Sequence, residues 1–327
     1  MTSHKPRALI THTLPEEWLR ELEKRCRILT GPPEATELSP ELEEHLPEAQ
    51  GLLTLLTIPV SEGLLDQAPK LKVISNMAVG YDNINVEACT RRGIPVGNTP
   101  GVLTEGTADL SMALLLVAAR RLPEASRDAR EGRWTTWSPT GWLGADLDGA
   151  TVGIVGMGKI GTAVARRAHA FGVKLVYTNR SPRPQVEEEL GATRLPMETL
   201  LAESDFVSLH VPLTPETEGM IDAQALRTMK STAILVNAAR GPVVVSEDLL
   251  QGLREGWIAA AALDVTDPEP LPPSDSLYDL PNCIITPHIG SATKNTRRRM
   301  AELACDNLLA GLEGRPLPHC VNPSVYD

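Results

Sequence analysis

Short apolar runs alternate with amphipathic stretches along the first hundred residues of this 327-residue chain. The runs at residues 8–10, 51–56 and 73–74 have the length of buried strands. Apolar positions recur with helical spacing at residues 16–25, 62–68 and 86–92. Strands that alternate with helices are typical of a parallel sheet covered on both faces. The pattern therefore predicts an α/β fold for this part of the chain.

The same alternation starts again at residue 151. We expect strands at residues 152–155, 174–177, 206–211, 233–236, 259–263 and 283–285, and helices at 163–170 and 246–254. The two longest predicted helices cover residues 104–121 and 294–312, and Gly314 and Pro316 give the second a normal stop signal. At about 150 residues per domain, the length favours two domains.

Composition and charge exclude several classes of partner. The chain has 31 Lys and Arg against 42 Asp and Glu, so its net charge of -11 repels nucleic acid and anionic membranes. Five widely spaced cysteines without a C-x-x-C pair indicate reduced thiols, a cytoplasmic location and no metal site. The longest apolar run, residues 112–119, is too short to cross a bilayer, and residues 1–13 lack the apolar core of a signal peptide.

A G-x-G-x-x-G motif directly follows the strand predicted at 152–155 and opens a helix. Gly156 permits a tight turn, Gly158 lets the backbone approach a pyrophosphate, and Gly161 lets the helix pack closely on the strand. The helix N-terminus, with Lys159 and Ile160, offers free N–H groups to the anion. Because strand, helix and second strand have the required spacing, we interpret the motif as a dinucleotide site rather than only a tight structural turn.

The second strand of this unit lacks the Asp or Glu that usually binds the ribose of NAD. Its end reads Asn179, Arg180, Ser181, Pro182 and Arg183. Two arginines and a serine hydroxyl can bind a 2′-phosphate through charge-assisted hydrogen bonds. The loop therefore predicts NADPH as the preferred cofactor and NADH as the weaker one. The alternative is a solvated basic turn on an acidic protein.

Two of the seven histidines, His210 and His288, follow predicted strands. Ligands of open α/β sheets bind beyond the carboxyl ends of the strands. His288 continues into Ile289, Gly290 and Ser291, a short loop in which backbone and ligand can come close. We therefore predict His288 as the acid/base, with His210 as the alternative.

Arg240 and Glu269 complete the candidate reacting groups. Arg240 follows another predicted strand, and its guanidinium can hold a substrate carboxylate through two hydrogen bonds, although an ion pair with an acidic neighbour is also possible. Glu269 lies in a proline-rich loop, where its carboxylate can orient His288 and favour the imidazolium. Asp267 in the same loop is the competing candidate.

Taken together, the motifs at residues 156–161, 237–241, 264–270 and 287–292 resemble those of the D-isomer-specific 2-hydroxyacid dehydrogenases, and the similarity covers nearly the whole chain. Within that family, residues 77–84, 98–104, 179–184 and 264–272 look most like glyoxylate/hydroxypyruvate reductases. The resemblance implies that Arg240, Glu269 and His288 form the catalytic set and that the Val79-Gly80 backbone and Ser291 contact the substrate. It implies that the nicotinamide lies against Thr107, Ala238, Asp264 and Gly290, and that Ile289 also binds the cofactor.

The resemblance also implies an architecture. A Rossmann doubly wound parallel sheet domain, residues 101–291, is inserted into a flavodoxin-like α/β substrate domain made of residues 1–100 and 292–327. The two crossings form a hinge, and closure about it excludes water.

Three of the five tryptophans, Trp134, Trp137 and Trp142, lie within nine residues. Local packing of a loop is one interpretation. The resemblance favours an interface arm of a homodimer, in which Trp137 reaches the neighbouring active site and binds substrate.

For the reaction, the resemblance implies reduction of glyoxylate and hydroxypyruvate to glycolate and D-glycerate by hydride transfer from NADPH, with His288 as acid/base and no metal. One alternative is another D-2-hydroxyacid dehydrogenase, such as one acting on D-lactate or a phosphoglycerate. The other is a nucleotide-sensing binding protein similar to corepressors of this fold. Turnover separates the sensor from the enzymes.

Overall fold

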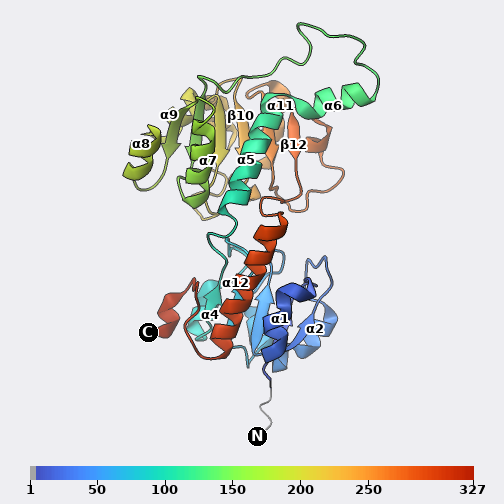
Figure 1. Ribbon diagram of the computed structural model, residues 1–327, viewed down its shortest axis with the longest axis vertical. Coiled ribbons are helices and arrows are strands. Elements are labelled where there is room, and N and C mark those ends of the chain that lie inside the picture. The colour runs from blue at the N-terminus through green and yellow to red at the C-terminus, as the bar shows by residue number, and fades with distance from the viewer. Residues whose placement is uncertain (1–4) are drawn as a thin grey trace. The chain divides into compact units, whose positions relative to one another are not determined.

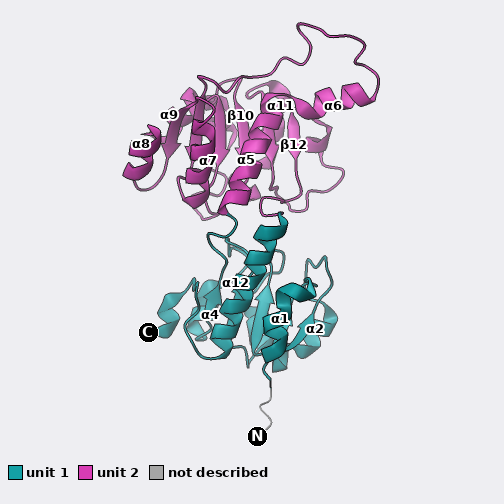
Figure 2. Cartoon of the chain, in the orientation of Figure 1, with its two compact units in different colours: residues 1–103, 293–327 teal, residues 104–292 magenta. Residues whose placement is uncertain are grey.

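The computed structural model describes residues 5–327 (Figure 1). Residues 1–4, where the segment considered as a signal peptide begins and where His4 lies, are outside the described residues. The chain divides into two compact units, residues 1–103 with 293–327 and residues 104–292 (Figure 2). The chain therefore crosses between units at 103/104 and 292/293, against expected crossings at 100/101 and 291/292.

The first unit contains a five-stranded parallel sheet in the order β2-β1-β3-β4-β5. This is the flavodoxin-like order, and the strand order reverses between β1 and β3. The strands are β1 (Arg7–Ile10), β2 (Arg27–Thr30), β3 (Gly51–Thr54), β4 (Val73–Asn76) and β5 (Val96–Gly97).

Helices cover both faces of this sheet. Ser39, Ser61 and Asn85 each accept a hydrogen bond from a backbone N–H in the first turn of α2, α3 and α4, which fixes where these short helices begin. Their apolar side chains pack on one face of the sheet, and α12 packs against β3 and β4 and against α1. The helices are α1 (Glu16–Arg25), α2 (Pro40–His45), α3 (Glu62–Gln67), α4 (Val86–Arg91) and α12 (Lys294–Leu312), with 3-10 turns at Leu46–Glu48 and Pro323–Tyr326.

The second unit contains a seven-stranded parallel sheet in the order β12-β11-β10-β9-β6-β7-β8. In sequence order its first six strands are arranged 3-2-1-4-5-6, the doubly wound Rossmann order, with one more strand at the end. The predicted fold class is therefore confirmed. The strands are β6 (Thr151–Val155), β7 (Lys174–Thr178), β8 (Thr193–Arg194), β9 (Phe206–Leu209), β10 (Ile234–Asn237), β11 (Ala260–Leu263) and β12 (Cys283–Ile285).

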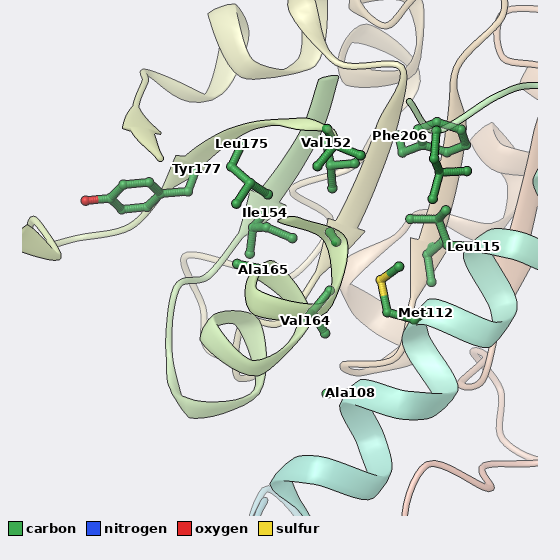
Figure 3. Close-up of a cluster of buried hydrophobic side chains, with 14 of the residues drawn as sticks. Ala108, Met112, Leu115, Val152, Ile154, Val164, Ala165, Leu175, Tyr177 and Phe206 are labelled. Atoms are coloured by element: carbon green, nitrogen blue, oxygen red, sulfur yellow. The ribbon is translucent and has the colours of Figure 1, made fainter. Parts of the chain in front are cut away.

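Two apolar clusters fill the two faces of this sheet. On one face, Met112 and Leu115 of α5 and Val164 of α7 pack against strand residues such as Ile154 and Phe206 (Figure 3). On the other face, α9, α10 and α11 supply the helical side chains. The helices are α5 (Thr104–Ala119), α6 (Leu122–Arg130), α7 (Lys159–His169), α8 (Pro184–Leu190), α9 (Met197–Glu203), α10 (Ala223–Thr228) and α11 (Ser246–Glu255), with 3-10 turns at Gly241–Val243 and Ser276–Asp279.

The helix predicted at 104–121 is shorter than expected. It ends at Ala119, Arg121 has a φ of 50°, and α6 begins at Leu122. Pro123 explains the break, because a proline ring clashes with the carbonyl group four residues earlier, here that of Ala119, and so prevents a continuous helix. Within residues 5–327, no helix has both the length and the apolar composition needed to span a membrane.

Candidate active site

Three candidate residues lie at the same edge of the seven-stranded sheet. Arg240 follows β10, Asp264 follows β11 and His288 follows β12. The strands are neighbours in register, with Asn237 opposite Leu263 and Leu263 opposite Ile285. Because the strands are parallel, their carboxyl ends meet at one edge, and this is where ligands of open α/β sheets bind.

His288 and Glu269 form a direct pair. His288 Nδ1 lies 2.5 Å from Glu269 Oε1, and the two side chains are 27% and 33% exposed. Glu269 Oε2 accepts a longer hydrogen bond, 3.4 Å, from the backbone N–H of Thr266. Of the two competing carboxylates, it is therefore Glu269 and not Asp267 that the structure places against the imidazole. A carboxylate at Nδ1 orients the ring and leaves Nε2 to act on a ligand.

Asp264 organises the loop that carries His288. Its carboxylate accepts hydrogen bonds from Thr286 Oγ1 at 2.6 Å and from the backbone N–H groups of Ile289 and Gly290, both at 2.8 Å. The side chain is only 2% exposed. His288 itself has a φ of 50°, an unusual left-handed conformation for a residue with a side chain, and its N–H donates to the Asp264 carbonyl at 2.9 Å. Asp264 thus fixes the backbone on both sides of the imidazole.

The predicted cofactor contacts Thr107 and Gly290 lie next to this loop. Thr107 Oγ1, in the first turn of α5, donates to the Gly290 carbonyl at 3.3 Å. Ser291 is half-buried, and the N–H of Ala292 closes the turn by donating to the Ile289 carbonyl at 2.8 Å. The structure therefore brings Thr107, Asp264, Ile289 and Gly290 together with His288.

The Arg240 turn packs directly against the loop that carries Glu269. A Cβ atom on Gly241 would lie 1.9 Å from the Thr266 backbone oxygen, so only glycine permits this approach. Asn237 closes the turn: its Nδ2 donates to the Arg240 carbonyl at 2.9 Å, and its Oδ1 accepts from the Ala239 N–H at 3.0 Å. Ala238 is half-buried within the same turn. The backbone of Arg240 is thus fixed close to the His288–Glu269 pair.

The alternative acid, His210, has different surroundings. Burial lowers its pKa to about 4, so its ring is neutral at pH 7. Ser208 Oγ lies 2.8 Å from Nε2, and within residues 5–327 the buried Nδ1 has no hydrogen-bond partner. A neutral imidazole without a carboxylate at its second nitrogen is a poor proton donor. The geometry favours His288.

The glycine loop has the shape that a diphosphate requires. Gly156 has a φ of 96°, and a Cβ atom there would lie 2.7 Å from the His210 backbone oxygen; one on Gly161 would lie 2.2 Å from the oxygen of Gly156. A Cβ on Gly158, in contrast, would meet no atom within 4 Å. The space above Gly158 is therefore open at the N-terminus of α7, where Lys159 and Ile160 provide N–H groups that the helix leaves unbonded. These residues fit a dinucleotide.

The basic loop after β7 is bound to the glycine loop. Arg183 Nε donates to the Met157 carbonyl at 2.9 Å, and the Arg183 N–H donates to the Tyr177 hydroxyl at 2.8 Å. Residues Arg180, Ser181, Pro182 and Arg183 are all exposed. The loop thus presents its basic side chains beside the motif that fits the diphosphate.

Sequence reasoning missed Arg194, which also fixes this loop. From β8, its guanidinium donates to the Asn179 carbonyl at 3.2 and 2.9 Å and to the Arg180 carbonyl at 3.1 Å. A two-residue strand has no recognisable pattern. The only available signal is a further arginine shortly after the Arg180–Arg183 segment.

The exposed tryptophans lie on the long loop between α6 and β6. Trp137 is 80% and Trp134 65% exposed, whereas Trp142 Nε1 donates to Asp128 Oδ2 at 2.9 Å. Local packing therefore accounts for Trp142 alone. Leu143 of the same loop lines a cavity of about 310 Å³. Residues that precede β10, β11 and β12 line the same cavity. This cavity therefore lies at the edge of the sheet opposite to the one that carries His288.

Val79 and Gly80, the predicted substrate contacts, belong to the other unit. They follow the carboxyl end of β4 and are half-buried. For metals, residues 5–327 contain no group of three or more His, Cys, Asp and Glu side chains placed to hold an ion.

Comparison with known proteins gives a consistent set of similarities. Residues 112–290 match the family model described as D-isomer specific 2-hydroxyacid dehydrogenase, NAD binding domain. A glyoxylate reductase of Korarchaeum cryptofilum is 49% identical over 98% of this chain and 97% of its own. The crystal structure of a protein from Thermus thermophilus is 49% identical, with a TM-score of 0.90 over 96% of this chain and 99% of that one. That of an NADPH-dependent glyoxylate/hydroxypyruvate reductase from Sinorhizobium meliloti, in complex with NADP and malonate, is 34% identical, with a TM-score of 0.83 over 97% of both chains.

Proposed function

Because the chain belongs to the D-isomer-specific 2-hydroxyacid dehydrogenases, we propose that it reduces glyoxylate and hydroxypyruvate with NADPH, forming glycolate and D-glycerate. The observation that carries the reaction type is the 2.5 Å contact between His288 Nδ1 and Glu269 Oε1 at the carboxyl edge of the sheet. A reduction at a carbonyl carbon needs a proton for the developing alkoxide, and this pair is built to supply one. The substrates are proposed from what similar proteins are named for.

In this proposal each reacting group has a separate role. The guanidinium of Arg240 holds the substrate carboxylate with two parallel hydrogen bonds, which orients the 2-oxo group. His288 gives its Nε2 proton to the carbonyl oxygen as negative charge develops there, and Glu269 stabilises the imidazolium before the transfer. When bound, NADPH supplies the hydride to C2. The partly exposed imidazole then regains its proton from solvent.

The loop after β7 supports NADPH over NADH. Asn179 stands where an NAD site usually has a carboxylate, so that position carries no negative charge to repel a 2′-phosphate. Arg180, Ser181 and Arg183 can bind that phosphate, with Pro182 between them. In the same proposal, Lys159 and Ile160 provide N–H groups to the diphosphate, while Ala238, Asp264 and Gly290 lie beside the nicotinamide.

A homodimer is part of the proposal. Trp134 and Trp137 expose large apolar surfaces on one loop, and large aromatic side chains are typical anchors of buried interfaces. Trp137 would then reach the substrate of the neighbouring subunit. The cysteines are free within residues 5–327, in keeping with a cytoplasmic location.

A substrate panel tests the proposal. Purified protein is assayed with glyoxylate, hydroxypyruvate, pyruvate and a phosphorylated 2-oxo acid, each with NADPH and NADH, without added metal. We expect the highest kcat/KM with glyoxylate or hydroxypyruvate and NADPH. A higher value with pyruvate or the phosphorylated acid would favour another dehydrogenase of the family. Bound NADPH with no turnover on any acid would favour a nucleotide sensor.

A further inference from the structure

Three successive backbone carbonyl groups after β4 each accept a hydrogen bond from another part of the same unit. The Ala78 carbonyl accepts the Thr99 backbone N–H, the Val79 carbonyl accepts Asn98 Nδ2, and the Gly80 carbonyl accepts Asn76 Nδ2, all at 2.8 Å. The N–H groups of Val79 and Gly80 donate to no other residue within 5–327. We propose that Asn98 and Asn76 are positioning residues that hold the backbone on either side of Gly80, so that these two N–H groups face the substrate carboxylate. The inference rests on the proposed function, which assigns a carboxylate to them.

The planarity of the peptide bond explains how a bound carbonyl aims an N–H. The carbonyl of one residue and the N–H of the next lie in one rigid plane and point in opposite directions. Holding the Ala78 carbonyl therefore fixes the Val79 N–H, and holding the Val79 carbonyl fixes the Gly80 N–H. Asn76 holds the Gly80 carbonyl and so fixes the peptide plane that follows Gly80. Since glycine has the widest choice of backbone angles, planes fixed on both sides of Gly80 remove the freedom that would otherwise turn its N–H away.

Asn76 is difficult to explain as a residue that only stabilises the core. It is fully buried, and within the described residues its Oδ1 has no hydrogen-bond partner. A buried acceptor without a partner lowers stability, and an apolar side chain would avoid that loss. Its Nδ2, however, has two acceptors, the Gly80 carbonyl and Asn83 Oδ1 at 3.2 Å. The side-chain amide of Asn76 therefore fixes the loop after β4 through the hydrogen bonds that its Nδ2 donates.

Neighbouring amides hold the two positioning residues in turn. Asn83 Nδ2 donates to the carbonyls of Leu55 and Ile58, at 3.2 and 3.0 Å, and so connects the loop after β4 to the one after β3. Asn307 Nδ2 in α12 donates to the Asn98 carbonyl at 2.9 Å. The network gives the two N–H groups a fixed direction before any ligand binds, which is what preorganised binding of an anion requires.

Replacing Asn98 tests the inference, because this residue is half-buried and holds the peptide plane of the Gly80 N–H. Asn98→Leu removes the donor and keeps the branched shape of the side chain, and Asn98→Ala is a second variant in case the first does not fold. We expect each to raise the KM for glyoxylate and the Ki of the carboxylate inhibitor oxamate about tenfold or more, the scale of one charge-assisted hydrogen bond. The KM for NADPH should stay within about twofold.

Asn322 provides the matched control. It is a buried amide of the same unit that donates to Thr90 Oγ1 and the Ile94 carbonyl, and none of its hydrogen bonds involves Val79 or Gly80. Asn322→Leu and Asn322→Ala should lower the urea midpoint while leaving the KM for glyoxylate and the Ki of oxamate unchanged. A purely structural role of Asn98 would make its variants behave like these.

The outcomes separate this inference from the proposed function. Wild-type turnover of glyoxylate or hydroxypyruvate tests the function, and the ratio of variant to wild-type KM tests the positioning. An active wild type with unchanged KM and Ki in folded Asn98 variants would overturn the positioning role alone. A wild type inactive on every 2-oxo acid would overturn both.

Discussion

A Cβ atom on Gly241 would lie 1.9 Å from the backbone oxygen of Thr266, far inside any real contact. This single approach joins the turn after β10 to the loop after β11. The first carries Arg240, and the second carries Glu269, which pairs with His288. The spacing of the candidate reacting groups therefore depends on the absence of one side chain.

The Gly241→Ala variant should lose both stability and activity. The added methyl group collides with backbone and not with a flexible side chain, so the two loops must separate, at a cost of about 1–3 kcal/mol. We expect a lower urea midpoint and a fall of kcat/KM by at least about tenfold, since small displacements of positioned groups are expensive in catalysis.

Gly63→Ala is the control for Gly241→Ala. Its Cβ would meet nothing closer than 3.8 Å, and alanine favours the helix α3 in which it lies. We expect unchanged kcat/KM and equal or slightly higher stability. Full activity in Gly241→Ala would show that the two loops need not touch.

Glu269 and Asp267 lie two residues apart, and only Glu269 contacts His288. Glu269→Gln keeps the shape of the side chain but removes the charge that stabilises the imidazolium. We expect kcat with glyoxylate to fall by about 10²-fold or more, the usual scale for a disturbed acid/base, with little change in the Kd of NADPH. Asp267→Asn should retain kcat within about twofold, and equal effects of the two substitutions would remove the special role of Glu269.

The sequence predicts the sheet and the glycine loop well because both depend on local patterns. The strand of residues 283–285 and the helices at 16–25 and 294–312 have the predicted bounds, since apolar spacing and stop signals lie within each segment. The edge strand β2 and the two-residue strands β5 and β8 were missed. None of the three has enough alternating positions to form a pattern, and β2 has no fully buried residue.

The hydrogen-bond networks could not be predicted in this way. Asp264 contacts Gly290, 26 positions away, and Asn98 is held by Asn307, 209 positions away. No spacing rule connects such residues, because the fold alone brings them together. Residue spacing alone leaves Asp267 as a competitor of Glu269 for the same reason: both lie in one loop, and the direction of each side chain depends on the folded backbone. Only the family resemblance selects Glu269 before the structure is known.

Acid should destabilise the protein partly through His210. Burial lowers its pKa to about 4, against about 6.5 in the unfolded chain. Between these two pKa values the unfolded state binds more protons at His210 than the folded state does. The free energy of unfolding therefore falls as the pH drops from about 6.5 toward 4, whereas above about pH 6.5 this residue does not lower it. The full effect is roughly 3 kcal/mol. Urea midpoints at pH 7 and pH 5 measure it.

His210→Gln should reduce the loss of stability between pH 7 and pH 5, whatever its effect on the absolute midpoint. The exposed His169, in the last turn of α7, serves as the control. His169→Gln should leave the wild-type difference between the two midpoints unchanged. The same pH sensitivity in all three proteins would mean that other groups cause it, among them His12, whose pKa burial also lowers.

Cofactor choice gives the sharpest contrast, because NADPH and NADH differ only in the 2′-phosphate. If Arg180 and Arg183 bind that phosphate, each charge-assisted hydrogen bond contributes about 1.5–3 kcal/mol, and one good contact gives at least about tenfold preference for NADPH. The Arg180→Ala, Arg183→Ala double variant should raise the KM for NADPH at least tenfold and leave the KM for NADH nearly unchanged. Asn179→Asp should act in the same direction, since it places a negative charge beside the phosphate.

Arg166→Ala is the matched control, because this arginine is exposed and paired with Glu189 on α8. Steady-state kinetics with both cofactors decides the question: an NADH preference in the wild type, or equal losses for both cofactors in the double variant, would reduce the loop to a solvated basic turn.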